Sequence, residues 1–173
     1  TEPFPETTLE LGFGRADITP QDSVPLFGYA DVVRQSTDIH DPLTVTCIFM
    51  KDGESTALLF SQDLNYSTNT ISPDLRLKLW EQTGVDQANI SFAATGTYGG
   101  PVIKDNSDAV LKWKETYTEA VLEAAKLAQE DLAPAALYSA EVEVEGMSFV
   151  HHYTMADGTT EDGYYGKLDQ EIT

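Results

Sequence analysis

The chain of 173 residues has little positive charge and almost no cysteine. Its 10 lysines and arginines stand against 29 aspartates and glutamates, so its formal net charge is −19 at pH 7. Nucleic acid and anionic membrane surfaces repel so acidic a chain, and we expect neither as a partner. The single cysteine, Cys47, excludes an intramolecular disulfide. It lies in the apolar run TVTCIFM, where we expect a buried strand residue rather than a nucleophile.

The sequence also lacks several features that would indicate a location or a chemistry. No apolar run has the length of a transmembrane helix. There is no G-x-S-x-G elbow, P-loop, H-E-x-x-H or paired-cysteine zinc motif. The chain begins with TEPFPETT, which indicates a trimmed chain or a mature N-terminus after removal of a leader, and we expect an extracellular or cell-envelope location. We expect residues 1–173 to form a single domain that is a fragment of a longer chain.

Hydrophobic patterning predicts strands in the first half of the chain. Residues 11–20, 41–53 and 55–63 are typical of strands, and the turn signal Asp52-Gly53 predicts an antiparallel hairpin between the second and the third. Residues 88–95 predict a further buried strand. The segment ALYSAEVEVEG, residues 136–146, alternates acidic with small or apolar residues, as a half-exposed strand does.

Two helices are predicted between these strands. The first runs through residues 70–85, with Ser72 as N-cap, Pro73 in the first turn and Gly84 at its end. The second lies in residues 107–134 and stops at Pro134. Its predicted apolar face consists of Val110, Trp113, Tyr117, Val121, Ala124 and Ala128. Because strand-helix-strand crossovers need parallel pairing, this order predicts a mixed α/β sheet with helices packed on it.

The sequence around four polar residues makes each a candidate catalytic or metal-binding residue. His40 lies between two carboxylates in TDIHDPLTV and could ligate a metal or transfer protons, although a lone loop histidine is more often structural or solvated. Asp63 ends a buried strand, where a site residue and a turn cap are equally common. His151 and His152 are adjacent, so on a strand they point to opposite faces and do not chelate one ion together.

Several segments resemble, in matching order, the N-terminal region of the neutral/alkaline (non-lysosomal) ceramidases. They are GRADITP with LFGYA, DIHDPLTVTCIFMKDG, ALLFSQDLN and APAALYSAEVEVEGMSFVHHYTMADGT. The resemblance implies the first part of a ceramidase-like catalytic domain. It also implies that family's reaction, zinc-dependent hydrolysis of the amide bond of an N-acyl sphingoid base. We therefore predict His40 and Asp63 as catalytic residues, and Tyr98 and His151 as substrate-binding residues.

The loop AATGTYGGP, residues 93–101, departs from that family in its chemistry. Where relatives have Ala-Thr-His-Thr-His-Ser-Gly-Pro, this chain has Gly96 and Tyr98 in place of the two histidines. In the family the first of these histidines is a zinc ligand and the second lies beside the metal. Glycine has no side-chain donor and tyrosine is only an occasional ligand. His151 similarly stands where relatives usually have an arginine that contacts the polar head of the substrate.

The resemblance thus implies a chain whose zinc chemistry is lost or severely reduced. We expect no cofactor in this chain, although the family uses zinc, and natural divergence explains the replaced residues better than a deliberate knockout. The expected partners are a lipid or small amide substrate and the C-terminal remainder of the parent chain. Three alternatives remain: a hydrolase with a rearranged site, a non-catalytic lipid- or glycan-binding relative, and a partial chain that needs its C-terminal partner to fold.

Overall fold

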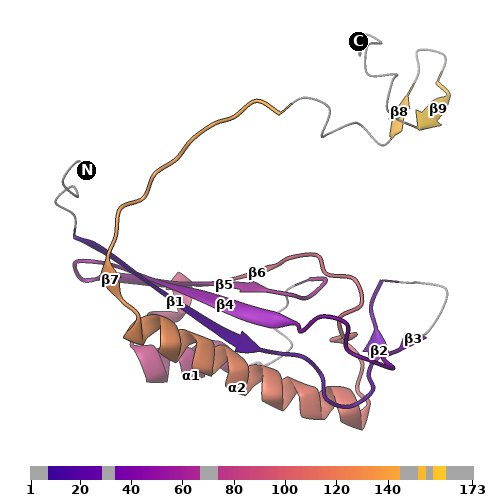
Figure 1. Cartoon of the computed structure of the whole chain (residues 1–173), viewed down its shortest axis with the longest axis horizontal. Helices are drawn as coiled ribbons and strands as arrows, with labels where there is room; N and C mark the ends of the chain where they lie inside the picture. The colour runs from indigo at the N-terminus through magenta and orange to yellow at the C-terminus, as the bar shows by residue number, and fades with distance from the viewer. Residues whose placement is uncertain (1–7, 29–33, 67–73, 145–151, 155–157, 163–173) are drawn as a thin grey trace. The chain divides into compact units, whose positions relative to one another are not determined.

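The computed structural model describes residues 8–28, 34–66, 74–144, 152–154 and 158–162, which belong to two compact units, residues 1–136 and 137–173. The first unit contains a five-stranded sheet in the order β6-β5-β4-β1-β7. Both of its helices lie on the same side of this sheet (Figure 1). The structure therefore confirms the predicted fold class, a mixed α/β sheet with helices packed on it.

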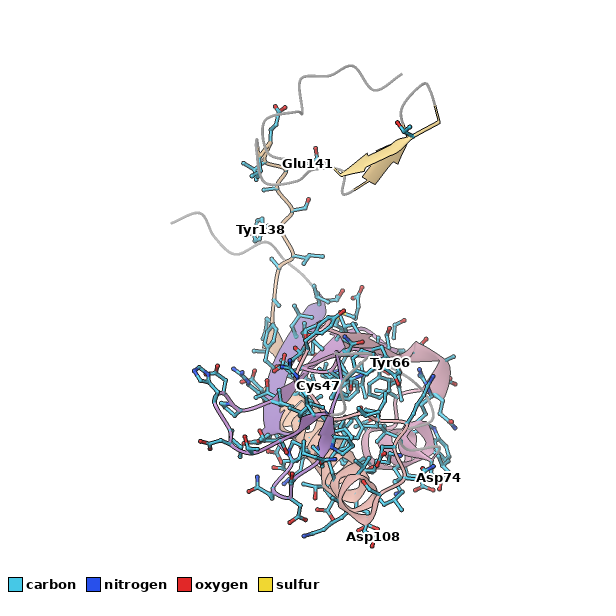
Figure 2. The ribbon with its side chains drawn as sticks, turned by 90° about the vertical axis from the view of Figure 1, so that its right-hand side faces the viewer. Cys47, Tyr66, Asp74, Asp108, Tyr138 and Glu141 are labelled. Carbon is cyan, nitrogen blue, oxygen red and sulfur yellow. The ribbon has the colours of Figure 1, made fainter. Side chains whose placement is uncertain are left out.

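The centre of the sheet is the predicted antiparallel hairpin. Strand β4 (Thr44–Asp52) pairs with β5 (Ser55–Gln62), and Gly53 turns the chain between them with a φ of 58°. That left-handed conformation favours glycine, which explains the turn signal in the sequence. The buried residues of β4 include Cys47, as expected, and the side chain lies inside the first unit (Figure 2).

Strand β1 (Leu9–Asp17) pairs antiparallel with β4 over its whole length. It ends at Asp17, three residues before the predicted end at Pro20. On its other side β1 pairs with the short strand β7 (Ala133–Pro134). A further small hairpin of the first unit joins β2 (Pro25–Leu26) and β3 (Arg34–Gln35).

The edge strand β6 (Ile90–Ala94) pairs in parallel with β5, as a crossover through a helix requires. The crossover contains α1 (Leu75–Thr83) and the 3-10 turn η1 (Gln87–Asn89). Helix α1 ends at Gly84, which has a left-handed φ of 77° as the sequence predicts. The other predicted signals of this helix, Ser72 and Pro73, lie outside the described residues.

The long helix α2 (Asp108–Glu130) packs against β1 and β4. All six residues of its predicted apolar face are buried. Glycines on β1 let the helix approach closely, because a Cβ atom at Gly12 or Gly14 would lie 1.9 or 2.0 Å from a carbonyl oxygen of α2. The helix ends at Glu130 rather than at Pro134, which lies in β7 instead.

One predicted element is wrong. Of residues 136–146, expected to form a half-exposed strand, residues 136–144 have no regular secondary structure, and residues 145–146 lie outside the described residues. Alternation makes a strand favourable only when a neighbouring edge pairs with it, and no described residue does so. In the second unit β8 (His152–Thr154) pairs antiparallel with β9 (Thr160–Asp162). His152 thus begins a strand, and His151 lies outside the described residues.

Candidate functional site

The loop after β6 is fixed to the end of β5 and to the residues that follow it. The backbone N–H of Thr95 donates to the carbonyl oxygen of Gln62 at 3.0 Å. The N–H groups of Gly96 and Thr97 donate to the carbonyl oxygen of Leu64 at 3.0 and 3.1 Å. Because β5 and β6 are parallel, both strands finish at the same end of the sheet. The hydrogen bonds hold the loop at this end.

A second segment holds the far end of the same loop. The N–H of Phe27 donates to the carbonyl oxygen of Gly100 at 2.8 Å, and the N–H of Gly99 donates to that of Phe27 at 3.1 Å. Val102 continues this pairing with Pro25 at 2.8 Å. The loop therefore has a defined backbone, fixed on both sides by main-chain hydrogen bonds.

Asp63 lies where β5 meets this loop, and its carboxylate connects neighbouring segments. One oxygen accepts hydrogen bonds from the backbone N–H and the hydroxyl of Thr44, at 2.9 and 2.8 Å. The other accepts a longer one from Thr95 at 3.4 Å. The hydroxyl groups of Thr95 and Thr97 are 2.7 Å apart. These bonds favour the capping role that the sequence left open, and a catalytic role of Asp63 stays a prediction.

His40 lies on a cavity of about 600 Å³ beside the loop. Its imidazole is exposed, and the Nδ1 atom lies 2.6 Å from a carboxylate oxygen of Asp41. No described hydrogen bond or ion pair joins His40 to Asp63. The other residues that line the cavity are Thr19, Pro20, Gln21, Asp22, Ser23, Val24, Leu26, Ser36, Thr37, Asp38, Ile39, Leu43, Thr97, Tyr98, Gly99 and Pro101.

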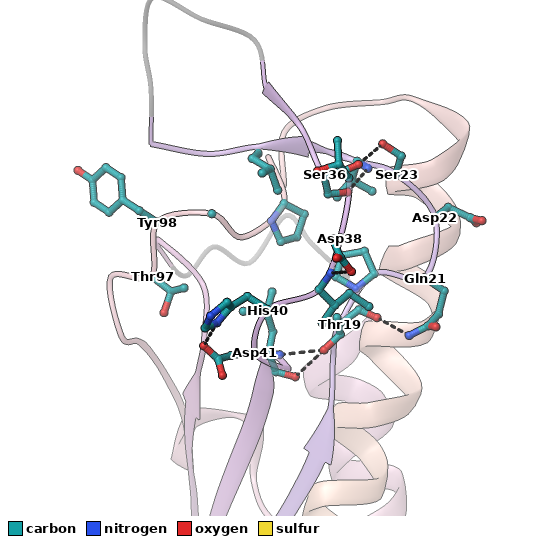
Figure 3. Close-up of a pocket in the computed structure, with 18 residues that line it drawn as sticks. Thr19, Gln21, Asp22, Ser23, Ser36, Asp38, His40, Asp41, Thr97 and Tyr98 are labelled. Carbon is teal, nitrogen blue, oxygen red and sulfur yellow. Dashed lines mark hydrogen bonds and ion pairs between the residues drawn. The ribbon is translucent and has the colours of Figure 1, made fainter.

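Tyr98 borders this cavity, but its ring points away from His40 and Asp41 (Figure 3). The ring packs over Gly28, where a Cβ atom would lie 2.0 Å from the tyrosine Cδ1 atom. Phe27 meets the ring edge-on, with the centroids 6.3 Å apart. The structure thus places Tyr98 and His40 around one cavity, while a substrate contact by the tyrosine stays a prediction.

The described residues do not fit a zinc site at this loop. Gly96 has a φ of 77°, carries no donor, and has open space where a side chain would begin. Within the part of the chain that the structure describes, no group of three or more histidine, cysteine, aspartate or glutamate side chains could hold a metal ion. A protein zinc site needs at least three such ligands, and the described residues do not supply them at this loop.

Sequence reasoning found only part of the opposite wall of the cavity. Residues 19–24 and 36–41 form it, and the hydroxyl of Thr19 fixes them by accepting a hydrogen bond from the N–H of Leu43 at 2.8 Å. Asp22 on this wall forms an ion pair with Lys112 of α2 at 2.7 Å. The segments GRADITP and DIHDPLTVTCIFMKDG, quoted for the family resemblance, reach only Thr19, Pro20 and residues 38–41 of this wall.

Comparison with known proteins shows the fold. No protein-family model matches the sequence, and neither does the sequence of any curated protein. Among solved structures, the chain is similar to neutral ceramidase from Pseudomonas aeruginosa, with a TM-score of 0.64 and 19% identity. A ceramidase complexed with C2 gives the same TM-score at 20% identity. Each match covers 75% of this chain and only 22% of the ceramidase chain.

These matches show that the fold is similar to part of a ceramidase, and any chemistry must be argued from the residues of this chain. At this identity the likeness shows the fold alone, and this chain spans about a fifth of the length of the chains it matches. None of the helices among the described residues combines the length and the hydropathy that crossing a bilayer requires.

Proposed function

We propose that this chain is part of a ceramidase-like protein that binds a lipid or small amide ligand and has lost zinc-dependent amide hydrolysis. The observation that carries the proposal is the loop at residues 93–101. Its backbone is fixed by hydrogen bonds on both sides, yet Gly96 supplies no ligand and the ring of Tyr98 packs on Gly28. The scaffold of a metal loop without its donors fits a binding protein better than a zinc hydrolase.

The cavity beside the loop supports the binding part of the proposal. Its volume of about 600 Å³ lies in the usual range for small-ligand sites. Leu26, Ile39 and Pro101 give it an apolar lining beside its polar groups. Ile39 is 51% exposed and so presents apolar surface to a ligand in the cavity.

Zinc titration and an activity assay test the loss of hydrolysis. Calorimetry with zinc chloride should show no stoichiometric site of sub-micromolar affinity. The chain should also release no fatty acid from a short-chain N-acylsphingosine, with and without added zinc. A tight equimolar zinc site, or turnover that a chelator abolishes, would contradict the proposal.

Restoring the donors tests the alignment of the loop. In a longer parent protein that supplies the remaining ligands, Gly96→His with Tyr98→His should raise zinc affinity at least about tenfold, because each missing ligand also misorients the others. The space around Gly96 is open, and its φ of 77° adds backbone strain of about 1 kcal/mol to any side chain placed there. If the affinity does not change, the loop is not the equivalent of the zinc loop.

A matched pair of variants tests ligand binding in the cavity. Ile39→Ser should weaken binding of a fluorescent short-chain ceramide, since it removes an exposed apolar side chain that lines the cavity. Leu77→Ser makes a similar change on α1, away from the cavity, at a residue that is 42% exposed. Equal effects of both variants would indicate non-specific adsorption. A glycan ligand is the second candidate, and methyl glycosides that compete with the fluorescent lipid would favour it.

We also propose that residues 1–173 belong to one ceramidase-like domain of a longer protein. The coverage of the matched ceramidase chains, 22%, supports this. A single cooperative calorimetric transition of the whole chain is expected for one domain. Two separate transitions, one for each compact unit, would contradict it.

A further inference from the structure

The cavity beside the loop at residues 93–101 has an acidic lining without a strongly basic residue. Its lining includes the carboxylates of Asp22, Asp38 and Asp41 and the imidazole of His40. None of the described residues that line it is a lysine or an arginine. The charge of a ligand therefore matters for binding in this cavity.

The three carboxylates are not equally available to a ligand. The charge of Asp22 is offset by its ion pair with Lys112 at 2.7 Å. Asp41 lies 2.6 Å from the imidazole of His40, which is positively charged only when protonated. One oxygen of Asp38 accepts a backbone N–H at 2.8 Å, and no lysine or arginine in the described part of the chain forms an ion pair with it. The negative charge left for a ligand is thus mainly that of Asp38 and Asp41.

Apolar surface lies next to these two carboxylates. Asp38 and Asp41 belong to the same short segment bordering the cavity (Figure 3). Ile39, between them in the sequence, lines the cavity with a half-exposed side chain. Leu26 and Pro101 add further apolar lining. This combination fits a molecule that carries a positive charge at the end of an alkyl chain.

The cost of removing water from the carboxylates distinguishes the possible ligands. A ligand that fills the cavity takes water away from Asp38 and Asp41, which is unfavourable unless another group compensates their charge. A neutral amide brings no charge, and a fatty acid brings a further negative one. A protonated amine brings an opposite charge and several N–H donors, so it replaces the lost hydration best.

A metal ion is not the cation that this lining fits. Zinc and calcium need several ligands that converge on one point. No group of three or more histidine, cysteine, aspartate or glutamate side chains among the described residues offers such a point. The N–H groups of an ammonium can instead bond to separate acceptors.

We propose that the cavity binds an amphiphilic primary amine, with its ammonium group beside Asp38 and Asp41 and its alkyl chain against Ile39. The inference rests on the binding function proposed above and assigns the chemical class of the ligand. It also separates binding from amide hydrolysis, because such a ligand has a free amine and no amide bond to cleave.

Four small probes test this choice with the whole chain at pH 7. At this pH octylamine is protonated, N-octylacetamide is neutral, octanoate is ionised, and methylamine has the charge without the chain. Calorimetry should show one saturable site for octylamine, with an affinity at least about tenfold higher than for N-octylacetamide. Octanoate and methylamine should not bind measurably. Octylamine should also shift the amide NMR resonances of residues 36–41.

The outcomes separate this inference from the proposed function. If N-octylacetamide or octanoate binds in the cavity as tightly as octylamine, the amine inference is wrong and the binding function stands. If none of the octyl compounds binds, both are wrong. Equal binding of methylamine and octylamine would show attraction of any cation to an acidic chain and would overturn the inference.

A matched pair of charge variants locates the ammonium group. Asp38→Asn with Asp41→Asn should weaken octylamine binding about tenfold and leave binding of N-octylacetamide nearly unchanged, because only the charges are removed. Glu115→Gln with Glu119→Gln makes the same change of net charge at exposed positions of α2 and should have little effect. Equal losses for both pairs would overturn the inference. Urea denaturation checks that both variants fold, and the probe series with the unaltered chain decides the question if one does not.

Discussion

The two faces of the central sheet have the same kind of sequence pattern and different environments. On the face toward the helices, Val45 and Cys47 of β4 are fully buried and Leu58 of β5 is 1% exposed. On the opposite face Leu59, the next residue of β5, is 36% exposed, and Phe13 of β1 is 55% exposed. Alternation along the strands therefore does not decide which face becomes the core. The position of the two helices decides it.

Leu58 and Leu59 allow the largest test of this difference, because they are neighbours of the same type on opposite faces. Leu58→Ala should lower the free energy of unfolding by about 3 kcal/mol, since it leaves a cavity under the helices. Leu59→Ala should lower it by less than about 1 kcal/mol. Urea denaturation measures both. Similar losses would mean that the open face is also buried in solution.

The close contact between β1 and α2 gives the next effect. Gly14→Ala should lower the free energy of unfolding by about 2 to 3 kcal/mol, because the new Cβ atom would lie 2.0 Å from the carbonyl oxygen of Ala124. Gly53→Ala is the control, at a turn with a φ of 58° and no atom within 4 Å of the new Cβ. It should cost about 1 kcal/mol, through backbone strain alone. If Gly14→Ala and Gly53→Ala lower the free energy of unfolding equally, α2 lies farther from β1 than the structure shows.

Alkaline pH should weaken the helix-covered face through Cys47. Burial raises the pKa of this thiol from 9.0 to about 12. Between those values the unfolded chain has released a proton that the folded chain still holds. This contribution to stability is complete below pH 9 and falls by about 1.4 kcal/mol for each pH unit above it. Urea titrations at several pH values between 8 and 11 should show that the free energy of unfolding falls less steeply with pH for Cys47→Val than for the unaltered chain. An unchanged slope would contradict the burial of the thiol.

Burial raises the pKa of the Tyr117 phenol as well. Its stabilising effect is also complete below the pKa of the unfolded chain, about 10, and is lost above that pH. For this reason Cys47→Val should remove only part of the alkaline slope.

A buried hydrogen bond on the same face gives the smallest effect. The hydroxyl of Tyr117 donates to the side-chain oxygen of Gln62 at 2.5 Å, while the Nε2 atom of Gln62 has no partner among the described residues. Tyr117→Phe should cost about 1 to 2 kcal/mol, because the buried amide then has no side-chain hydrogen bond at all. Adding Gln62→Met should recover most of that loss. If the double variant has a lower free energy of unfolding than Tyr117→Phe alone, the Gln62 amide has a further hydrogen-bond partner.

The elements could be predicted where local chemistry is strong. The hairpin turn at Gly53, the end of α1 at Gly84 and the apolar face of α2 each follow from neighbouring residues, and the structure confirms all three. Residues 136–144 could not be predicted in the same way. Their alternation is as regular as that of a strand, but strand formation depends on a partner edge that these residues themselves do not specify.

The candidate site was predictable only in part. The sequence placed His40 and Tyr98 in separate motifs, and the structure puts both on one cavity. It also shows that Asp63 bonds to Thr44 and Thr95, and that Tyr98 lies over Gly28. These contacts join residues that are distant in the chain, so no local pattern contains them.

The acidic character of the chain, the order of the hairpin, the first helix, the strand β6 and the long helix, and the lack of a donor at Gly96 follow from the amino-acid sequence alone. These properties depend on residue type and on spacing over a few positions. Which face of the sheet is covered, and which segments surround the cavity, depend on tertiary contacts. Those outcomes follow from backbone hydrogen bonds and close packing between β5, β6, α2 and residues 25–28, and such contacts exist only once the chain has folded.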